Sequence, residues 1–197
     1  LWERFSYYGM RALFTIFLVA ETTSQNPGFG WSNEKALWLY GWYTMLVYIA
    51  AIPGGWIADN LLGQKKMVML GGLLLCIGHG ILAFDSEFSF YIGCVFIILG
   101  VGGLKPNISS MVGGLYPPGD ERRDLGFYIF YMGINLGAFL APLFCGWVGE
   151  TYNWHYGFGL AAIGMAIGQI TYYFGQKYLV GVGELKKISV EKKKELR

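Results

Sequence analysis

Four ionisable residues lie inside long apolar stretches of this 197-residue sequence, namely Glu3, Arg4, Arg11 and Lys105. A charge near the centre of a membrane helix costs about 2.5 to 3.5 kcal/mol, so such residues face a partner or a water-filled cavity. A carboxylate keeps a buried lysine protonated, and protonation of that carboxylate releases the lysine for another anion. These residue types predict a proton-dependent anion site, with Arg11 and Lys105 on facing helices as a clamp for a substrate carboxylate.

The spacing of the first residues predicts one polar stripe on a helix. At about 100° per residue, an arc of roughly 140° holds two cations, one carboxylate and two phenols; these are Glu3, Arg4, Tyr7, Tyr8 and Arg11. Two tyrosines in such a stripe supply hydrogen bonds and apolar walls. We expect the stripe to face the interior of a bundle or a water-filled cavity.

A simpler interpretation exists for three of these charges. Glu3 and Arg4 could lie at a helix end and extend to the membrane surface. Lys105 could end its helix, because Pro106 follows it directly. Against this, residues 108–116 are still largely apolar and the charged loop begins only at position 120, which favours a functional Lys105.

The composition excludes several classes of protein. Hydrophobic residues make up 54% of the chain and charged residues only 14%, against roughly 25% charged in a soluble domain. A net charge of +2 indicates no nucleic-acid partner. The three cysteines lie in apolar runs, and the two histidines, His79 and His155, are isolated, so we expect structural roles for all five. A single intramembrane carboxylate without a His or Cys cluster predicts that the protein is not an enzyme.

Six stretches have the length of about 20 residues needed to cross a bilayer of about 30 Å. They predict spans at residues 1–20, 36–58, 67–84, 88–116, 125–149 and 156–176. Prolines 53, 106 and 142 lie inside spans and are candidate kinks. The apolar pattern starts with the first residue, so we interpret the first span as truncated at its start.

Basic residues divide unequally between the two sets of loops. Eleven lie between spans two and three, between spans four and five, or after span six, and only Lys35 lies in the opposite loops. Because Lys and Arg mark cytoplasmic loops, both ends of this chain are expected to be cytoplasmic. We therefore divide the chain into a six-helix transmembrane bundle at 1–178 and a basic cytoplasmic tail or linker at 179–197.

Two similar strings suggest an internal repeat. Residues 55–59 end span two and residues 146–150 end span five, each with a Gly-Trp-aliphatic-small-acidic order. If spans one to three correspond to spans four to six, the second copy is inverted in the membrane because three is an odd number. Inverted repeats are typical of transporters.

Four motifs in register resemble one family. Residues 1–9 read LWERFSYYG, which is similar to the first-helix signature E-x-x-E-R-F-x-Y-Y-G of the proton-dependent oligopeptide transporters, a branch of the major facilitator superfamily. The leading Glu of that signature would precede Leu1. Residues 54–66 (GGWIADNLLGQKK) resemble the superfamily's loop motif, residues 102–107 (GGLKPN) the fourth-helix lysine segment, and residues 127–142 (FYIFYMGINLGAFLAP) the fifth-helix signature.

The resemblance implies roles for the matching residues. It places Glu3, Arg4 and Lys105 in a proton-coupling cluster, and it makes Arg11 and Lys105 the receivers of a peptide carboxylate. The positions that match peptide-contacting residues of the family are Tyr7, Tyr8, Tyr48 and Asn135, of which Tyr48 is placed only by its spacing before the glycine pair at 54–55.

The loop motif implies a conformational role for three further residues. Asp59 resembles the acid that steadies one conformation of the transporter, and Gly55 and Gly63 resemble the glycines that permit close helix approach and a tight turn. The sequence departs from the superfamily pattern at Asn60 and Gln64, where basic residues are frequent.

Together these features imply an all-α membrane protein whose six transmembrane helices form the N-terminal bundle of a major facilitator superfamily fold, a 3+3 inverted repeat. The implied function is a proton-coupled symporter that imports di- and tripeptides by alternating access, located in the plasma (cell inner) membrane. Protons are the coupling ion, no cofactor or metal is expected, and the C-terminal six-helix bundle is absent from this chain. The alternatives are a transporter of nitrate or another small anion, and a non-transporting membrane subunit.

Overall fold

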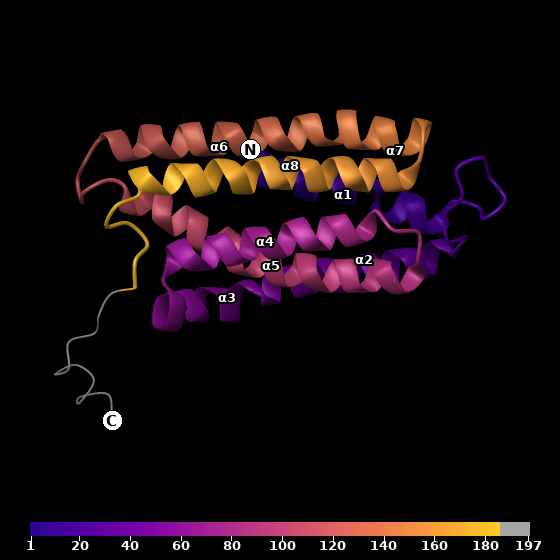
Figure 1. Cartoon of the computed structure of the whole chain (residues 1–197), viewed down its shortest axis with the longest axis horizontal. Helices are drawn as coiled ribbons and strands as arrows, with labels where there is room; N and C mark the ends of the chain where they lie inside the picture. The colour runs from indigo at the N-terminus through magenta and orange to yellow at the C-terminus, as the bar shows by residue number, and fades with distance from the viewer. Residues whose placement is uncertain (186–197) are drawn as a thin grey trace, which may run out of the picture.

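The computed structural model describes residues 1–185 as helices joined by turns, and the predictions for 186–197 lie outside the described residues. Figure 1 shows the helices side by side along one common axis. They form six rods, of which three are single helices, α1 (Trp2–Val19), α4 (Gln64–Leu82) and α5 (Glu87–Gly114). The composite rods are α2 (Asn33–Ile49) with α3 (Ala51–Ile57) and η1 (Ala58–Leu62), α6 (Arg122–Ala141) with η2 (Pro142–Gly146) and α7 (Trp147–Thr151), and α8 (Trp154–Gly175) with η3 (Gln176–Tyr178).

The all-helical membrane fold is confirmed, with differences at the ends of the spans. Five rods are long and apolar enough to cross a membrane, at 33–62, 64–82, 87–114, 122–151 and 154–178. The sixth rod, α1, has 18 residues and carries the charges of Glu3, Arg4 and Arg11. Several rods extend beyond the predicted spans. The predicted boundaries lie where an uncharged run ends, whereas a helix continues past the edge of the apolar layer.

The three prolines affect their rods differently. Pro53 follows the break between α2 and α3 at Ala50, and Pro142 begins the π-helical turn η2. Pro106 lies inside α5, which continues without a break to Gly114. A proline donates no backbone hydrogen bond, so each position leaves one carbonyl of the preceding turn without its helical donor. Pro53 and Pro142 therefore lie at local breaks in α-helical geometry, whereas Pro106 lies within a continuous helix.

Glycines let α4 and α5 pack at close range. A Cβ atom on Gly71 would lie 2.7 Å from the Gly100 carbonyl oxygen, and one on Gly78 would lie 2.9 Å from the Gly93 carbonyl oxygen. Within a membrane, small residues at helix contacts allow this approach of backbones. The two helices are therefore closely packed, and α5 carries Lys105.

Aromatic side chains fill the core on the other side of α5. Phe90 lies 5.1 Å from Phe14 and 5.8 Å from Phe17 between ring centroids. Phe158 of α8 joins them at 5.5 Å from Phe17. This cluster holds α1 between α5 and α8, which fixes the face of α1 that carries the polar stripe.

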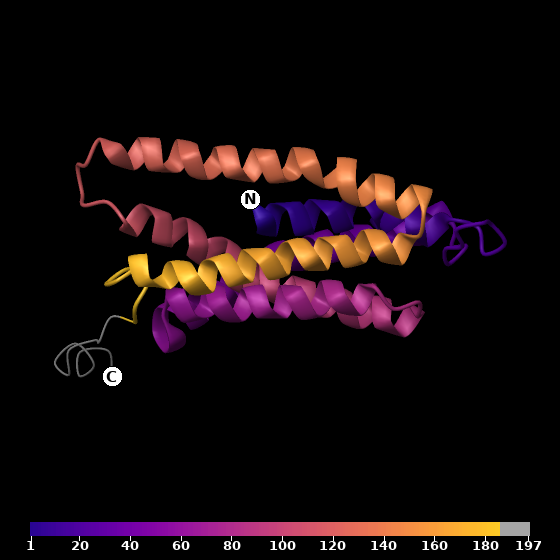
Figure 2. The same cartoon turned by 45° about the horizontal axis from the view of Figure 1, so that its top comes forward.

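Five basic residues of the described chain gather at one end of the bundle, which we call the basic end; they are Lys65, Lys66, Arg122, Arg123 and Lys177. The turns that carry them lie on the left in Figures 1 and 2. The string at 55–59 runs toward this end and the string at 146–150 runs toward the opposite end. Two copies at opposed ends are what an inverted repeat requires.

The loop at residues 20–32 folds over the opposite end of the bundle. Its Asn26 side chain donates to the Gly149 carbonyl at 2.7 Å, and its main-chain carbonyl accepts from Trp154 Nε1 at 2.9 Å. His155 lies nearby, with Nδ1 3.3 Å from the Leu82 carbonyl and Nε2 3.5 Å from Asp85. These contacts hold the turns of α1, α4 and α8 together, away from the polar stripe.

Candidate functional site

Glu3 and Arg4 form an ion pair in the first turn of α1. The Arg4 guanidinium donates to the Glu3 carboxylate, and the Arg4 and Glu3 side chains are 10% and 15% exposed. Pairing between neighbouring residues reduces the cost of two charges in an apolar bundle. The Arg4 guanidinium also lies over the Tyr7 ring, 5.3 Å from its centroid. Glu3 and Arg4 are therefore inside the bundle, which disfavours the interpretation that they extend to the membrane surface.

Arg11 sits in a cluster of three tyrosines. Its Nε donates to the Tyr40 hydroxyl at 2.8 Å. Its guanidinium carbon lies 5.3 Å from the centroid of the Tyr40 ring, 5.6 Å from that of Tyr7 and 5.8 Å from that of Tyr8. Aromatic faces attract a guanidinium, and they leave its remaining N–H groups available to an anion. The structure thus orients the Arg11 guanidinium and leaves some of its N–H donors without a partner among the described residues.

Tyr40 is a site residue that the sequence analysis missed. It lies on α2, eight residues before Tyr48, so the two side chains lie within about 80° of each other around the helix. That common face is the one signal in the sequence that could have identified Tyr40. Tyr48 was identified only through the motif that follows it.

Lys105 projects from α5 toward the same rod. Its Nζ lies 4.5 Å from the centroid of the Tyr48 ring. Tyr48 itself is 61% exposed, so this contact lies at the edge of the described bundle. Among the ion pairs of residues 1–185 none involves Lys105, whose ammonium therefore has capacity for an anion.

A cavity of about 360 Å³ brings the predicted proton-coupling residues together. Glu3, Arg4 and Tyr8 line it from α1, and Lys105 lines it from α5. The α6 side chains on its remaining wall are Phe130, Tyr131 and Ile134. Residues about a hundred positions apart in the sequence thus share one small polar space.

The remaining predicted contact residues are not all in this cavity. Tyr7 is buried, with 5% of its surface exposed, between Arg4 and Arg11. Asn135 is exposed on α6, one residue after the cavity-lining Ile134. Arg11 and Tyr48 do not line the cavity, and Arg11 belongs to the adjoining tyrosine cluster. The structure thus describes two adjacent cationic groups, one at Arg11 and one at Arg4 and Lys105.

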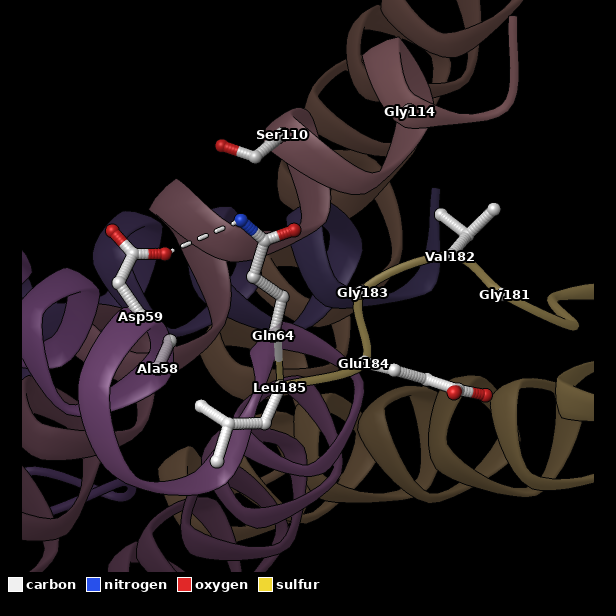
Figure 3. Close-up of a pocket in the computed structure, with 10 residues that line it drawn as sticks. All are labelled: Ala58, Asp59, Gln64, Ser110, Gly114, Gly181, Val182, Gly183, Glu184 and Leu185. Carbon is white, nitrogen blue, oxygen red and sulfur yellow. Dashed lines mark hydrogen bonds between the residues drawn. The ribbon is translucent and has the colours of Figure 1, made fainter. Parts of the chain in front are cut away.

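The loop motif lies at the basic end, beside a second cavity of about 680 Å³ (Figure 3). Gly63 adopts φ +84°, a left-handed conformation that favours glycine, and forms the turn between η1 and α4. Gln64 Nε2 donates to Asp59 Oδ1 at 3.4 Å, so a neutral amide occupies the place where the superfamily often has a basic residue. The Gly183 carbonyl accepts from the Lys65 N–H at 2.8 Å, which brings the segment after α8 across this turn.

Within the described bundle a close helix approach occurs at Gly54, the neighbour of Gly55. A Cβ atom on Gly54 would lie 2.6 Å from the carbonyl carbon of Gly102 in α5, whereas a Cβ atom on Gly55 would meet open space. The two neighbours point about 100° apart around α3, and only one of them can face α5. The structure thus adds Gly54 as a point of close helix contact, places Gly63 and Asp59 at the turn, and leaves the role of Gly55 a prediction.

Comparison with known proteins identifies the family. The model described as "POT family" matches residues 65–194. The di-/tripeptide transporter of Lactococcus lactis subsp. cremoris is 49% identical over 89% of this chain, and the uncharacterized transporter YclF of Bacillus subtilis is 50% identical over 92%. The aligned region is 35% and 37% of those proteins, so the chain spans about a third of the length of these curated relatives.

Comparison with solved structures leads to the same family. A peptide transporter POT in complex with sulfate is 46% identical, superposes with a TM-score of 0.90, and is matched over 99% of this chain and 40% of its own. A POT family transporter in complex with a thioalcohol conjugated peptide is 41% identical with a TM-score of 0.87, again over 99% and 40%. On the motifs, the fold and these comparisons, the chain belongs to the POT family.

Proposed function

We propose that this chain is the N-terminal half of a proton-coupled symporter that imports di- and tripeptides by alternating access. The observation that carries the proposal is the cavity in which Glu3, Arg4 and Lys105 meet beside the tyrosine-held Arg11. Relatives named as di-/tripeptide transporters support the substrate class. A C-terminal half outside the given sequence would supply the other wall of the binding site.

The charges support separate roles for the two cations and for the neutral residues of the site. Lys105 has no ion-pair partner among residues 1–185, and Arg11 has guanidinium donors that Tyr40 does not use. In our proposal these two cations receive the C-terminal carboxylate of the peptide, since charge-assisted hydrogen bonds to a carboxylate are strong. Tyr7, Tyr8, Tyr48 and Asn135 would contact the rest of the peptide.

Glu3 would couple protons to this binding. Its carboxylate neutralises Arg4 at the cavity wall. Protonation of Glu3 removes that negative charge, so the cavity becomes more cationic and favours an incoming carboxylate. A peptide and a proton would thus bind together and leave together.

We also propose the topology and the location. The basic end, with the turns at 63–66 and 115–123, would face the cytoplasm, together with both ends of this chain. The bundle would lie in the lipid bilayer of the plasma (cell inner) membrane. In this arrangement Asp59 and Gly63 form part of the cytoplasmic gate.

The test uses the complete transporter that contains this chain, reconstituted in liposomes. An inward proton gradient should drive accumulation of a labelled dipeptide, and Lys105→Ala should abolish it. Glu3→Gln should lose accumulation while keeping exchange of peptide across the membrane. Accumulation of dipeptide that persists in Lys105→Ala would refute the assignment of Lys105.

A second assay separates the alternatives. Nitrate offered in place of dipeptide should neither accumulate nor compete. Accumulation of nitrate without that of dipeptide would favour a small-anion transporter. If neither dipeptide nor nitrate shifts the melting temperature of the purified protein, a non-transporting subunit is favoured.

A further inference from the structure

α5 lacks one internal hydrogen bond at the turn that carries Lys105. Pro106 has no N–H, so the Gly102 carbonyl receives no donor from the residue four positions later. The backbone of α3 packs directly against this point, because a Cβ atom on Gly54 would lie 2.6 Å from the Gly102 carbonyl carbon and 3.0 Å from Gly103 N. The weakened turn of α5 is therefore in backbone contact with α3.

Asn107 joins the two helices at this contact. Its side chain is buried, and its Nδ2 donates to the Gly103 carbonyl of α5 at 2.7 Å and to the Gly54 carbonyl of α3 at 3.4 Å. One amide group thus bonds to its own helix and to a neighbour 53 residues earlier in the chain. In an apolar environment such bonds are retained, because no water is present to replace them.

The same rod also holds the ammonium group. Tyr48, six residues before Gly54, lies under Lys105 Nζ at 4.5 Å. The helix segment that bears Lys105 and the tip of its side chain are therefore both located relative to the rod formed by α2 and α3. A shift of α5 against α3 would move the ammonium away from Tyr48.

We propose that Asn107 is a positioning residue for Lys105. Its two hydrogen bonds hold the proline-weakened turn of α5 against α3 and so set the place at which the ammonium meets a substrate carboxylate. This inference rests on the proposed function, in which Lys105 receives that carboxylate. Displacement of a binding group by about 1 Å is enough to weaken its action by up to about 100-fold.

Three variants of the complete transporter test the proposal. Asn107→Leu has a similar volume and no hydrogen bonds. Asn107→Ser keeps a hydroxyl that can bond back to the Gly103 carbonyl four residues earlier, but it is too short to reach α3. Ser110→Ala is the matched control, because the exposed Ser110 bonds, among residues 1–185, only to the Pro106 carbonyl of its own helix, at 3.1 Å.

The readout is the KM for a dipeptide and for the same dipeptide with a C-terminal amide, measured by exchange in liposomes. The wild type should prefer the free carboxylate. We expect Asn107→Leu and Asn107→Ser to raise the KM for the dipeptide by about tenfold and to leave that for the amide unchanged, because both variants release the turn from α3 and a displacement of about 1 Å weakens the action of a binding group by up to about 100-fold. Ser110→Ala should leave both KM values unchanged.

Two results would overturn the inference. A lower maximal rate or melting temperature with an unchanged ratio of the two KM values would make Asn107 merely structural. A normal ratio in Asn107→Ser would show that the bond to α3 is not needed, and this variant decides the matter if Asn107→Leu does not fold. Lys105→Ala is measured alongside: if it still prefers the free carboxylate, the proposed function fails, and if it does not, only the role of Asn107 is in question.

Discussion

The Tyr40 hydroxyl is the single hydrogen-bonding group that holds Arg11 within the described structure, and its removal is a sharp test of the site. Tyr40→Phe deletes the acceptor 2.8 Å from Arg11 Nε. It keeps the ring that lies 5.3 Å from the guanidinium and 5.5 Å from Phe14. The change therefore loosens the orientation of Arg11 without removing the cation or the packing around it.

The expected size of the effect follows from these contacts. A hydrogen bond from a charged donor contributes about 1.5 to 3 kcal/mol. Arg11 is half-buried, so water replaces part of the lost bond, and the contacts with the Tyr7 and Tyr8 rings persist. We expect a loss of about 1 kcal/mol in the free energy of peptide binding, which corresponds to roughly fivefold weaker affinity.

Calorimetric titration of the complete purified transporter with a dipeptide measures this loss. Tyr43→Phe is the matched control on the same helix, because its buried hydroxyl has no hydrogen-bond partner in the described structure. That variant should keep the affinity and gain stability, since an unsatisfied buried hydroxyl is costly. An unchanged affinity in Tyr40→Phe, or an equal loss for the dipeptide and its C-terminal amide, would refute the role of Tyr40 in orienting Arg11 toward a carboxylate.

Further expectations concern the helix contact and the loop at the basic end. Gly54→Ala should lower the free energy of unfolding by about 1 to 3 kcal/mol, because its Cβ would lie 2.6 Å from the Gly102 carbonyl carbon. A Cβ atom on Gly55 would meet open space in the described structure, so Gly55→Ala should be neutral or stabilising by up to about 1 kcal/mol; equal melting temperatures of the two variants would contradict the packing described above. The Arg122 guanidinium donates to Asp120 at 2.7 Å and lowers the pKa of that carboxyl. Arg122→Gln should therefore raise the pKa of Asp120 toward its ordinary value, as followed by NMR titration. Because the pKa is lowered in the folded state, the stabilisation that the pair contributes is present at neutral pH and is lost as the pH falls.

Much of the fold and part of the site follow from local properties of the chain. The six rods could be predicted because a helix crossing a bilayer needs a run of apolar residues of fixed length. Their ends could not be placed well, since a helix such as α6 continues through Arg122 into its charged turn. Glu3, Arg4, Arg11 and Lys105 were identifiable because a charge is rare and costly among apolar residues.

The sequence by itself thus determined which residues are charged in an apolar setting, which segments are helices, and which family the motifs resemble. Only the tertiary structure decided that Arg11 is held by Tyr40, 29 residues away, that Asn107 bonds to Gly54, and that Gly54 rather than Gly55 meets α5. Such partners depend on how each helix is rotated about its axis and on its height against its neighbours. These two quantities are set by packing between rods, and an apolar sequence with little amphipathic contrast carries almost no record of them.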